Sequence, residues 1–261
     1  MVQQLKFSYC TEYEFDKPVT DHHFVIKCFP YSRDRQKVII DEMCISDNDF
    51  CVEAWDFCNN KKLYGDIMLP HTEFKYMIKG RAEIDTEAAD YDDRHNGIFL
   101  VETPLTMAGD RILAHVDTIR EKYPDTSGYD FCSRVNSYVN SLLEYRQMCT
   151  DVNTSAEDAC ELGYGVCQDY THIMLSILRK FGIPARYVVG MMKGEGLSHA
   201  WVECFTDRWY GFDPTNNKAL DGDYIKISHG RDYRDCMVMR GTMKGGGTQR
   251  QMVIVIVEED K

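Results

Sequence analysis

Residues 163–182 read GYGVCQDYTHIMLSILRKFG, and they predict a buried helix that begins close to a cysteine. Gly182 supplies a left-handed stop at the C-terminal end of this helix. Cys167 lies in the first turn, after two glycines that let the backbone approach closely. The unpaired N–H groups of a helix N-terminus favour an anion, so Cys167 is a candidate nucleophile and the same groups are candidate donors to an oxyanion. The apolar residues of the predicted buried face are Ile173, Met174, Ile177, Leu178 and Phe181.

The segment SHAWVECFTDRWYGFDPT, residues 198–215, predicts a β-hairpin that supplies a base and a carboxylate. If residues 206–208 form the turn, Asp213 lies opposite Trp201 and diagonal to His199 on one face. Such diagonal neighbours are about 7–8 Å apart at Cα, within reach of a hydrogen bond between imidazole and carboxylate. We therefore expect Asp213 to hold the tautomer of His199 while the other ring nitrogen faces Cys167, as in a catalytic triad. A turn one residue longer or shorter would place the two side chains on opposite faces.

The order of elements along the chain predicts an α+β fold. Residues 1 to about 85 contain short β-rich segments separated by turn residues, for example at 16–18, and they predict a small β-sandwich. An acidic segment at 86–104 predicts an exposed connection, so the expected domains are 1–90 and 91–261. Thr154 and Glu157 form the pattern of a capping box for a short helix. Beyond residue 90, helices are expected within 107–123, 129–146, 154–162 and 168–182, and strands at 185–192, 199–205, 209–215 and 251–259.

Composition excludes several classes of function. The 261 residues include 42 acidic and 30 basic ones, and the net charge of −12 has the wrong sign for a nucleic-acid partner. No run of 18 apolar residues occurs, so no membrane span is expected. The eleven cysteines and the absence of a signal-like start indicate a reducing, cytoplasmic location with free thiols. No CxxC spacing occurs, and the adjacent His22 and His23 point to opposite faces of a strand, so neither a metal nor a cofactor is expected.

Four blocks of sequence resemble the transglutaminase-like superfamily, in the bacterial branch described as cysteine peptidases. They are GYGVCQDYTHIMLSILRKFGIPARYVVG, SHAWVECF, WYGFDPT and HGRDYRDCMVMRGTMKGGGTQ. The YEFDKPV and HHFVIKCFP segments also look like the β-rich N-terminal region of that branch. The resemblance implies a papain-like core, in which a helix carrying the nucleophile packs on an antiparallel sheet. It also implies reaction at a carboxamide through a thioester, with Cys167, His199 and Asp213 as nucleophile, base and orienting carboxylate.

The function expected on this basis is a cysteine hydrolase, a peptidase or amidase, whose substrate is a peptide or protein. Two alternatives remain open: a protein-glutamine acyltransferase with an amine acceptor, and a binding module that keeps the fold without turnover. Tyr164, Gln168 and Trp201 are candidates for substrate or oxyanion contacts, with core packing or helix capping as the alternative. Asp169 is expected to cap the first turn. The sequence predicts neither the natural substrate nor the oligomeric state.

Overall fold

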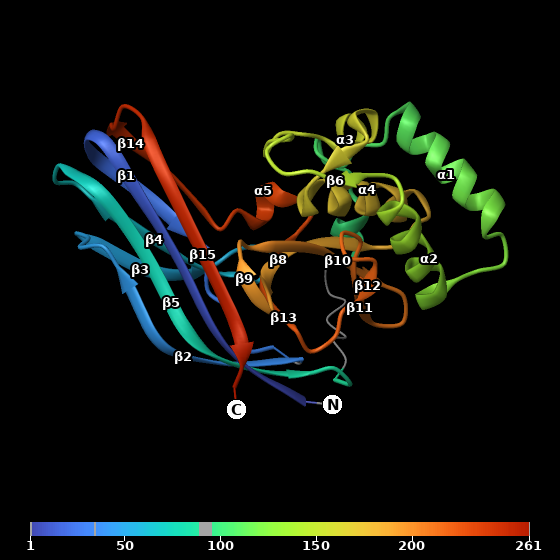
Figure 1. Cartoon of the computed structure of the whole chain (residues 1–261), viewed down its shortest axis with the longest axis horizontal. Coiled ribbons are helices and arrows are strands. Elements are labelled where there is room, and N and C mark those ends of the chain that lie inside the picture. Colours follow the sequence, from blue (N-terminus) through green and yellow to red (C-terminus); the bar gives the residue numbers. More distant parts are fainter. Residues whose placement is uncertain (1, 34, 89–95, 261) are drawn as a thin grey trace.

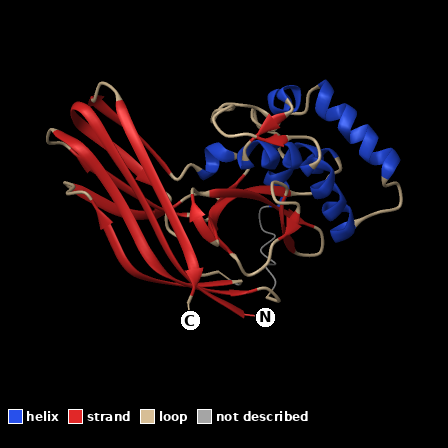
Figure 2. Ribbon diagram, in the orientation of Figure 1, coloured by secondary structure: helices blue, strands red, loops and turns tan. Residues whose placement is uncertain are grey.

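The computed structural model describes residues 2–33, 35–88 and 96–260. It confirms the α+β class, with two larger antiparallel sheets and one short parallel pair of strands. Figure 1 shows a large curved sheet at one end of the molecule and helices at the other, with a smaller sheet between them. Figure 2 shows the same division into a strand-only part and a mixed part. The expected domain boundary between residues 90 and 91 lies outside the described residues.

The large sheet has eight strands arranged around one long strand, β1. The first half of β1 pairs with β5 and β15, and its second half pairs with β4 and β14. The second half of β1 also packs against β5, since the ring centroids of Phe24 in β1 and Phe74 in β5 are 4.9 Å apart. The strands are β1 (Val2–Ile26), β2 (Gln36–Ile45), β3 (Phe50–Trp55), β4 (Lys61–Ile67), β5 (His71–Asp85), β9 (Gly194–Gly196), β14 (Met239–Gly245) and β15 (Gln249–Glu259).

The turn expected at residues 16–18 is not a reversal of the chain. Strand β1 continues through these residues, and its pairing register shifts between Glu14 and Val19. Proline is tolerated at such a bulge because no ladder hydrogen bond needs its missing N–H. The Pro18 carbonyl accepts from Gly246 N–H at 3.3 Å, and Asp16 N–H donates to the Thr248 carbonyl at 3.1 Å. Residues 16–18, which favour a turn in the sequence, therefore form an irregularity within a single strand.

The C-terminal strands lie in the large sheet, although the division of the sequence assigns them to the core. Residues 249–259 pair with residues 5–15 of β1, and residues 239–245 pair with its second half. Alternation of apolar and polar residues predicts a strand but not the strand with which it pairs. The two ends of the chain therefore build one sheet together.

The core is a five-stranded antiparallel sheet with the order β12-β11-β10-β8-β13, against which helix α4 packs. Helix α4 is buried on most of its surface rather than on one face, because α1, α2 and α3 also contact it. No helix among the described residues is long and apolar enough to cross a membrane. The core strands are β8 (Ala185–Met192), β10 (His199–Phe205), β11 (Trp209–Asp213), β12 (Lys218–Ala219) and β13 (Tyr224–Gly230), with a short pair β6 (Glu144–Tyr145) and β7 (Tyr164–Gly165). The helices are η1 (Asn96–Leu100), α1 (Asp110–Lys122), α2 (Gly128–Asn140), α3 (Ala156–Leu162), α4 (Cys167–Lys180) and α5 (Tyr233–Cys236).

The capping box of α3 is one residue later than expected. Ser155 is the N-cap, and its side chain and that of Asp158 make the reciprocal bonds. Glu157 instead reaches the start of α1, where its carboxylate accepts from the N–H groups of Gly109, Arg111 and Ile112. An acidic side chain there neutralises unpaired donors at the N-terminus of α1. Both Thr154 with Glu157 and Ser155 with Asp158 have the spacing of a capping box, so spacing alone does not show which pair caps the helix.

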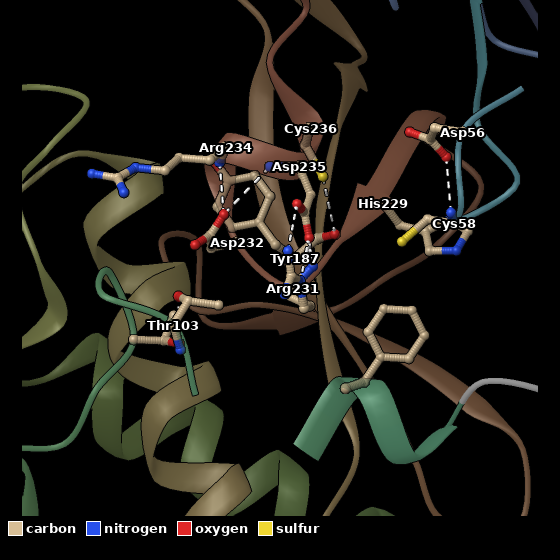
Figure 3. A network of polar contacts seen from close by, with 12 residues as sticks. Asp56, Cys58, Thr103, Tyr187, His229, Arg231, Asp232, Arg234, Asp235 and Cys236 are labelled. Atoms are coloured by element: carbon tan, nitrogen blue, oxygen red, sulfur yellow. Dashed lines mark hydrogen bonds and ion pairs between the residues drawn. The ribbon is translucent and has the colours of Figure 1, made fainter. Parts of the chain in front are cut away.

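Buried polar contacts join the large sheet to the core. Asn60, in the β3–β4 turn, accepts from the N–H of His229 at 2.9 Å and donates to its carbonyl at 2.7 Å. Lys27 Nζ donates to Asp56 Oδ2 at 2.6 Å and to the Asp235 carbonyl at 2.5 Å. Figure 3 shows Asp56 and Cys58 from the large sheet beside His229 and the Arg231–Asp235 ion pair. Removal of either side of these contacts would leave polar groups buried without partners.

The Asn60→Ala variant is expected to lose about 2–4 kcal/mol of unfolding free energy, because each buried polar group without a partner costs about 1–3 kcal/mol. Asn60 is fully buried, and its loss leaves both backbone groups of His229 unsatisfied. Urea denaturation measures the change. The control is Asn48→Ala, since Asn48 is exposed and its side chain donates to the nearby Ser46 carbonyl. Equal stability of the two variants would contradict a structural role for Asn60.

Candidate active site

Cys167 is the first residue of α4, and a tight loop holds it there. The carboxylate of Asp169 accepts from Val166 N–H and from Thr150 Oγ1, both at 2.7 Å, so the predicted capping role of Asp169 is confirmed. A Cβ on Gly165 would lie only 2.7 Å from the Asp169 side chain, which explains the second glycine before the cysteine. The N–H groups of Cys167 and Gln168 belong to the first turn, where a helix offers them no carbonyl. They are able to donate to an anion beside the thiol.

The predicted register of the hairpin is confirmed. Phe205 pairs with Trp209 and Val202 pairs with Phe212, so residues 206–208 form the turn. His199 begins β10 and Asp213 ends β11, and His199 Nε2 lies 2.8 Å from Asp213 Oδ2. Because Nε2 is bonded to the carboxylate, Nδ1 is the ring nitrogen left for the thiol. The structure therefore brings His199 and Asp213 together as the sequence predicts.

Asp213 is fully buried, and each of its carboxylate oxygens accepts two or more hydrogen bonds. Oδ2 also accepts from Tyr224 Oη and from Asn216 Nδ2, both at 2.7 Å. Oδ1 accepts from the N–H groups of Thr215 and Asn216. Burial alone would raise the pKa of Asp213, but the hydrogen bonds and the charge of His199 outweigh it and lower this pKa to about 2. The carboxylate is thus fixed in its charged form.

His199 is held in its charged form by its neighbours. Burial opposes protonation of the ring, but the hydrogen bonds with Asp213 and with the Cys167 thiol outweigh burial and raise the pKa of His199 to about 10. An imidazolium beside a thiol favours the thiolate. The charged imidazole of His199 is therefore hydrogen-bonded to the Asp213 carboxylate on one side and to the Cys167 thiol on the other.

Two cavities meet at the thiol and the imidazole. The first, of about 310 Å³, extends toward the large sheet, and the second, of about 460 Å³, extends toward β9 and residues 145–148. Both are lined by Val166, Cys167, Leu197, Ser198 and His199. A chain bound across the site can therefore occupy space on both sides of the thiol. Volumes of this size are typical of ligand-binding sites.

The other candidate residues lie in different surroundings. Gln168 lines the first cavity, and its Nε2 donates to the Asp151 carbonyl at 3.2 Å. Tyr164 lies outside both cavities, with the Arg146 guanidinium 4.2 Å from its ring centroid. Trp201 is buried between His199 and Tyr224 and lines neither cavity. These positions favour packing over substrate contact for Tyr164 and Trp201. Trp201 shares a face of β10 with His199, but it lies one step deeper in the sheet, where Tyr224 packs on its ring.

The sequence does not predict two hydrogen bonds that support the site, from the Asn216 amide and from the Tyr224 hydroxyl to the Asp213 carboxylate. The position of Asn216, three residues after the aspartate of an Asp-Pro pair, is a local signal for a turn that closes on that aspartate. Tyr224 carries no such signal, because β13 reaches the site through its pairing with β8. Among the residues that the structure describes, no group of three His, Cys, Asp or Glu side chains is arranged to hold a metal ion.

Iodoacetamide at about pH 6 is expected to modify Cys167 before the other ten cysteines. Exposure alone would favour Cys44 and Cys51, which are more exposed than Cys167. His199 is charged at this pH, because its pKa is raised to about 10, and it favours the reactive thiolate. Peptide mapping by mass spectrometry after partial modification gives the order of labelling. Uniform labelling, or faster labelling of Cys44 and Cys51, would count against a special Cys167.

Comparisons with known proteins identify the family and the fold that this chain resembles. The family described as "Transglutaminase-like superfamily" matches residues 117–214, and "Bacterial transglutaminase-like N-terminal region" matches residues 5–83. The uncharacterized protein ML0607 of Mycobacterium leprae is 27% identical over 277 aligned residues, which cover 97% of each chain. The uncharacterized protein Rv2569c of Mycobacterium tuberculosis is 33% identical over 114 residues, which cover 37% of this chain and 36% of that protein.

One solved structure is similar over nearly the whole molecule. It is the crystal structure of a candidate cysteine protease from Cytophaga hutchinsonii, with a TM-score of 0.79 and 17% identity, and the match covers 99% of this chain and 91% of that chain. At this identity the similarity shows the fold. The match includes both the large sheet and the core, so the two parts occur together in another protein.

Proposed function

Because the chain belongs to the transglutaminase-like superfamily, we propose that it is a cysteine hydrolase acting on a peptide or side-chain carboxamide through a thioester. The observation that carries this proposal is the order of Cys167, His199 and Asp213 at the junction of two cavities, with 2.8 Å between His199 Nε2 and Asp213 Oδ2. Such an order of thiol, imidazole and carboxylate suits nucleophilic catalysis. We include a cytoplasmic location in the proposal, because the eleven free cysteines are most readily kept as thiols in reducing surroundings.

In the first half of the proposed reaction, the Cys167 thiolate attacks the carbonyl carbon of the carboxamide. The negative charge that forms on the carbonyl oxygen is accepted by the unpaired N–H groups of Cys167 and Gln168. The C–N bond then breaks, and the His199 imidazolium gives its Nδ1 proton to the leaving nitrogen. Ammonia or an amine leaves, and the acyl group remains on Cys167 as a thioester.

In the second half, water attacks the thioester carbonyl. The now neutral His199 takes a proton from this water, the carbon–sulfur bond breaks, and the acid leaves while the thiolate and imidazolium are restored. Asp213 keeps Nε2 protonated throughout, so Nδ1 stays free for the transfer. An amine in place of water would give the acyltransferase reaction from the same thioester.

The proposal is tested by incubation of the protein with a library of glutamine-containing peptides, with and without methylamine. Mass spectrometry of rapidly quenched samples is expected to find an acyl group on Cys167 and, without amine, a hydrolysed carboxamide or peptide bond. Methylamine incorporation in excess of hydrolysis would replace the hydrolase by the acyltransferase. Absence of both an acyl-enzyme and any product across the library would instead favour the binding module.

A further inference from the structure

One wall of the first cavity comes from the large sheet rather than from the core. Residues 9, 11 and 13 of β1 alternate along the strand, so their side chains share the face that looks toward the core. Gln251 and Val253 of β15 extend this face, and β15 pairs with β1 at these positions. The cavity lining from the large sheet and the strand leading into it is Tyr9, Thr11, Tyr13, Val238, Met239, Gln251 and Val253.

Among the described residues, the complete lining of the first cavity, from the large sheet and the core together, carries no Asp, Glu, Lys or Arg side chain, although the molecule as a whole has a net charge of −12. Four tyrosines dominate it: Tyr9, Tyr13, Tyr187 and Tyr233. Burial raises the pKa of each of these tyrosines, so all four are neutral hydroxyls at physiological pH. His199 lines this cavity as a charged side chain, and it is already paired with Asp213. A charged substrate group would therefore lose its water without gaining a counter-ion.

The second cavity differs in just this respect. Lys193 and Glu195 line it, and Lys193 is paired with Asp223 and Glu259. A charged group placed on that side of the thiol meets partners of both signs. Discrimination by charge is thus expected on the side of β1 and β15 and not on the side of β9.

From this lining we infer that the first cavity is a substrate subsite for an uncharged side chain, with the large sheet as the element that sets specificity. The inference rests on the proposed function, since it assigns the substrate class of the same site. Uncharged aromatic, aliphatic and carboxamide side chains fit the chemistry of the wall. Tyrosine rings supply flat apolar surface, and their hydroxyls together with the Gln251 amide supply neutral hydrogen bonds.

The wall is held rigidly against the nucleophile. Lys27 N–H, directly after β1, donates to the Val238 carbonyl at 2.7 Å, which ties the cavity-lining segment to the large sheet. On the other side, β15 pairs with β9, and the chain from β9 leads directly through Leu197 and Ser198 to His199. The wall and the imidazole are thus parts of one hydrogen-bonded framework. A subsite built in this way is formed before the substrate binds.

Charge substitutions at Gln251 test the inference. Gln251 is exposed on the cavity wall, so Gln251→Glu and Gln251→Lys are tolerated by the fold. The probes are fluorescent peptides that contain one reactive glutamine. Leu, Asp or Lys is placed directly before this glutamine in one set and directly after it in a second set. Affinity is measured on proteins that also carry Cys167→Ala, and kcat/KM on proteins with the thiol intact. The matched controls are Gln249→Glu and Gln249→Lys, two residues along the same face of β15 and outside the cavity lining.

The protein with Gln251 is expected to bind the Leu peptide about 10-fold or more tightly than the Asp and Lys peptides. Gln251→Glu should selectively improve binding of the Lys peptide, and Gln251→Lys that of the Asp peptide, by several-fold relative to the Gln249 controls. Equal affinity for all three peptides, no binding, or equal shifts in the Gln249 variants would overturn the subsite. Selective binding without any turnover would support the subsite and overturn the proposed hydrolase alone.

Discussion

The Cys167→Ala variant is expected to lose turnover by a factor on the order of 10⁴ or more while it keeps its fold. No other group in the cleft can form the thioester, so the loss should appear in kcat rather than in KM alone. Alanine is a good helix former in the first turn, and the bond from Thr171 Oγ1 to the carbonyl of residue 167 does not involve the thiol. Steady-state kinetics on a peptide from the library and a thermal melt measure the two effects.

The matched control for this variant is Cys160→Ala. Cys160 is half-buried like Cys167 and lies on the neighbouring helix α3. Burial raises the pKa of the Cys160 thiol to about 12, so it is not a nucleophile at neutral pH. Removal of this thiol is expected to leave turnover within about two-fold of the wild type, since it lies outside the mechanism. Comparable losses in both variants would indicate a general effect of thiol removal and contradict the assignment of Cys167.

The sequence was sufficient for the features that depend on local spacing. The hairpin that joins His199 to Asp213 has a three-residue turn, and the turn length fixes which side chains share a face. Helix α4 has apolar spacing and a glycine stop at Gly182, whose φ of +71° is the left-handed value that glycine adopts most readily. The placement of Cys167 at the start of this helix follows from the same pattern. Each of these features is set by residues close together in the chain.

The features that the sequence did not predict depend on contacts between distant residues. Residues 5–15 pair with 249–259, and no local pattern specifies this partner. Strand β13 was absent from the predicted strands. All seven of its residues are buried, but Lys226 and His229 are among them, and such polar residues are not expected in a buried strand. Tyr224, at its start, then reaches Asp213 only through the order of the sheet. The part of the site that supports Asp213 is thus tertiary in origin.

The same reasoning explains why the role of the large sheet is visible only in the structure. The part of the first cavity's lining that belongs to the large sheet comes from both ends of the chain, from residues 9–13 and 238–253, which are separated in sequence by more than 220 residues. Each looks like an ordinary core or strand residue when it is read locally. Only the pairing of β1 with β15 places Tyr13 and Gln251 opposite each other beside Cys167.

The Asp213→Asn variant is expected to retain the site geometry but to lose about 10²–10⁴-fold in kcat/KM. Asp213 is a positioning residue, because it acts on the substrate only through His199. An amide cannot stabilise the imidazolium as the carboxylate does, and burial, which opposes the charged ring, then dominates the pKa of His199. The alkaline limb of the kcat/KM profile, expected near pH 10 in the wild type, should therefore move toward lower pH. Peptide turnover measured across the pH range gives both quantities.

The free energy of unfolding should also depend on pH through the pKa values of His199 and Asp213. The pKa of His199 is raised from 6.5 to about 10, so its contribution is fully present below about pH 6.5 and is lost as pH rises toward 10. The pKa of Asp213 is lowered from 3.8 to about 2, so its contribution is present above about pH 4 and is lost as pH falls toward 2. The difference in unfolding free energy between wild type and Asp213→Asn should therefore be largest between about pH 4 and 6.5.

The Tyr224→Phe variant separates this electrostatic role from simple packing. It removes one donor to Asp213 Oδ2 but keeps the ring that packs on Trp201 at 5.4 Å between centroids. The carboxylate and its bond to His199 remain, so the alkaline limb should stay near its wild-type position and kcat/KM should fall by no more than about 10-fold. If instead Tyr224→Phe and Asp213→Asn lower kcat/KM equally and neither moves the alkaline limb, then Asp213 serves the site only as a buried packing group and does not set the charge of His199.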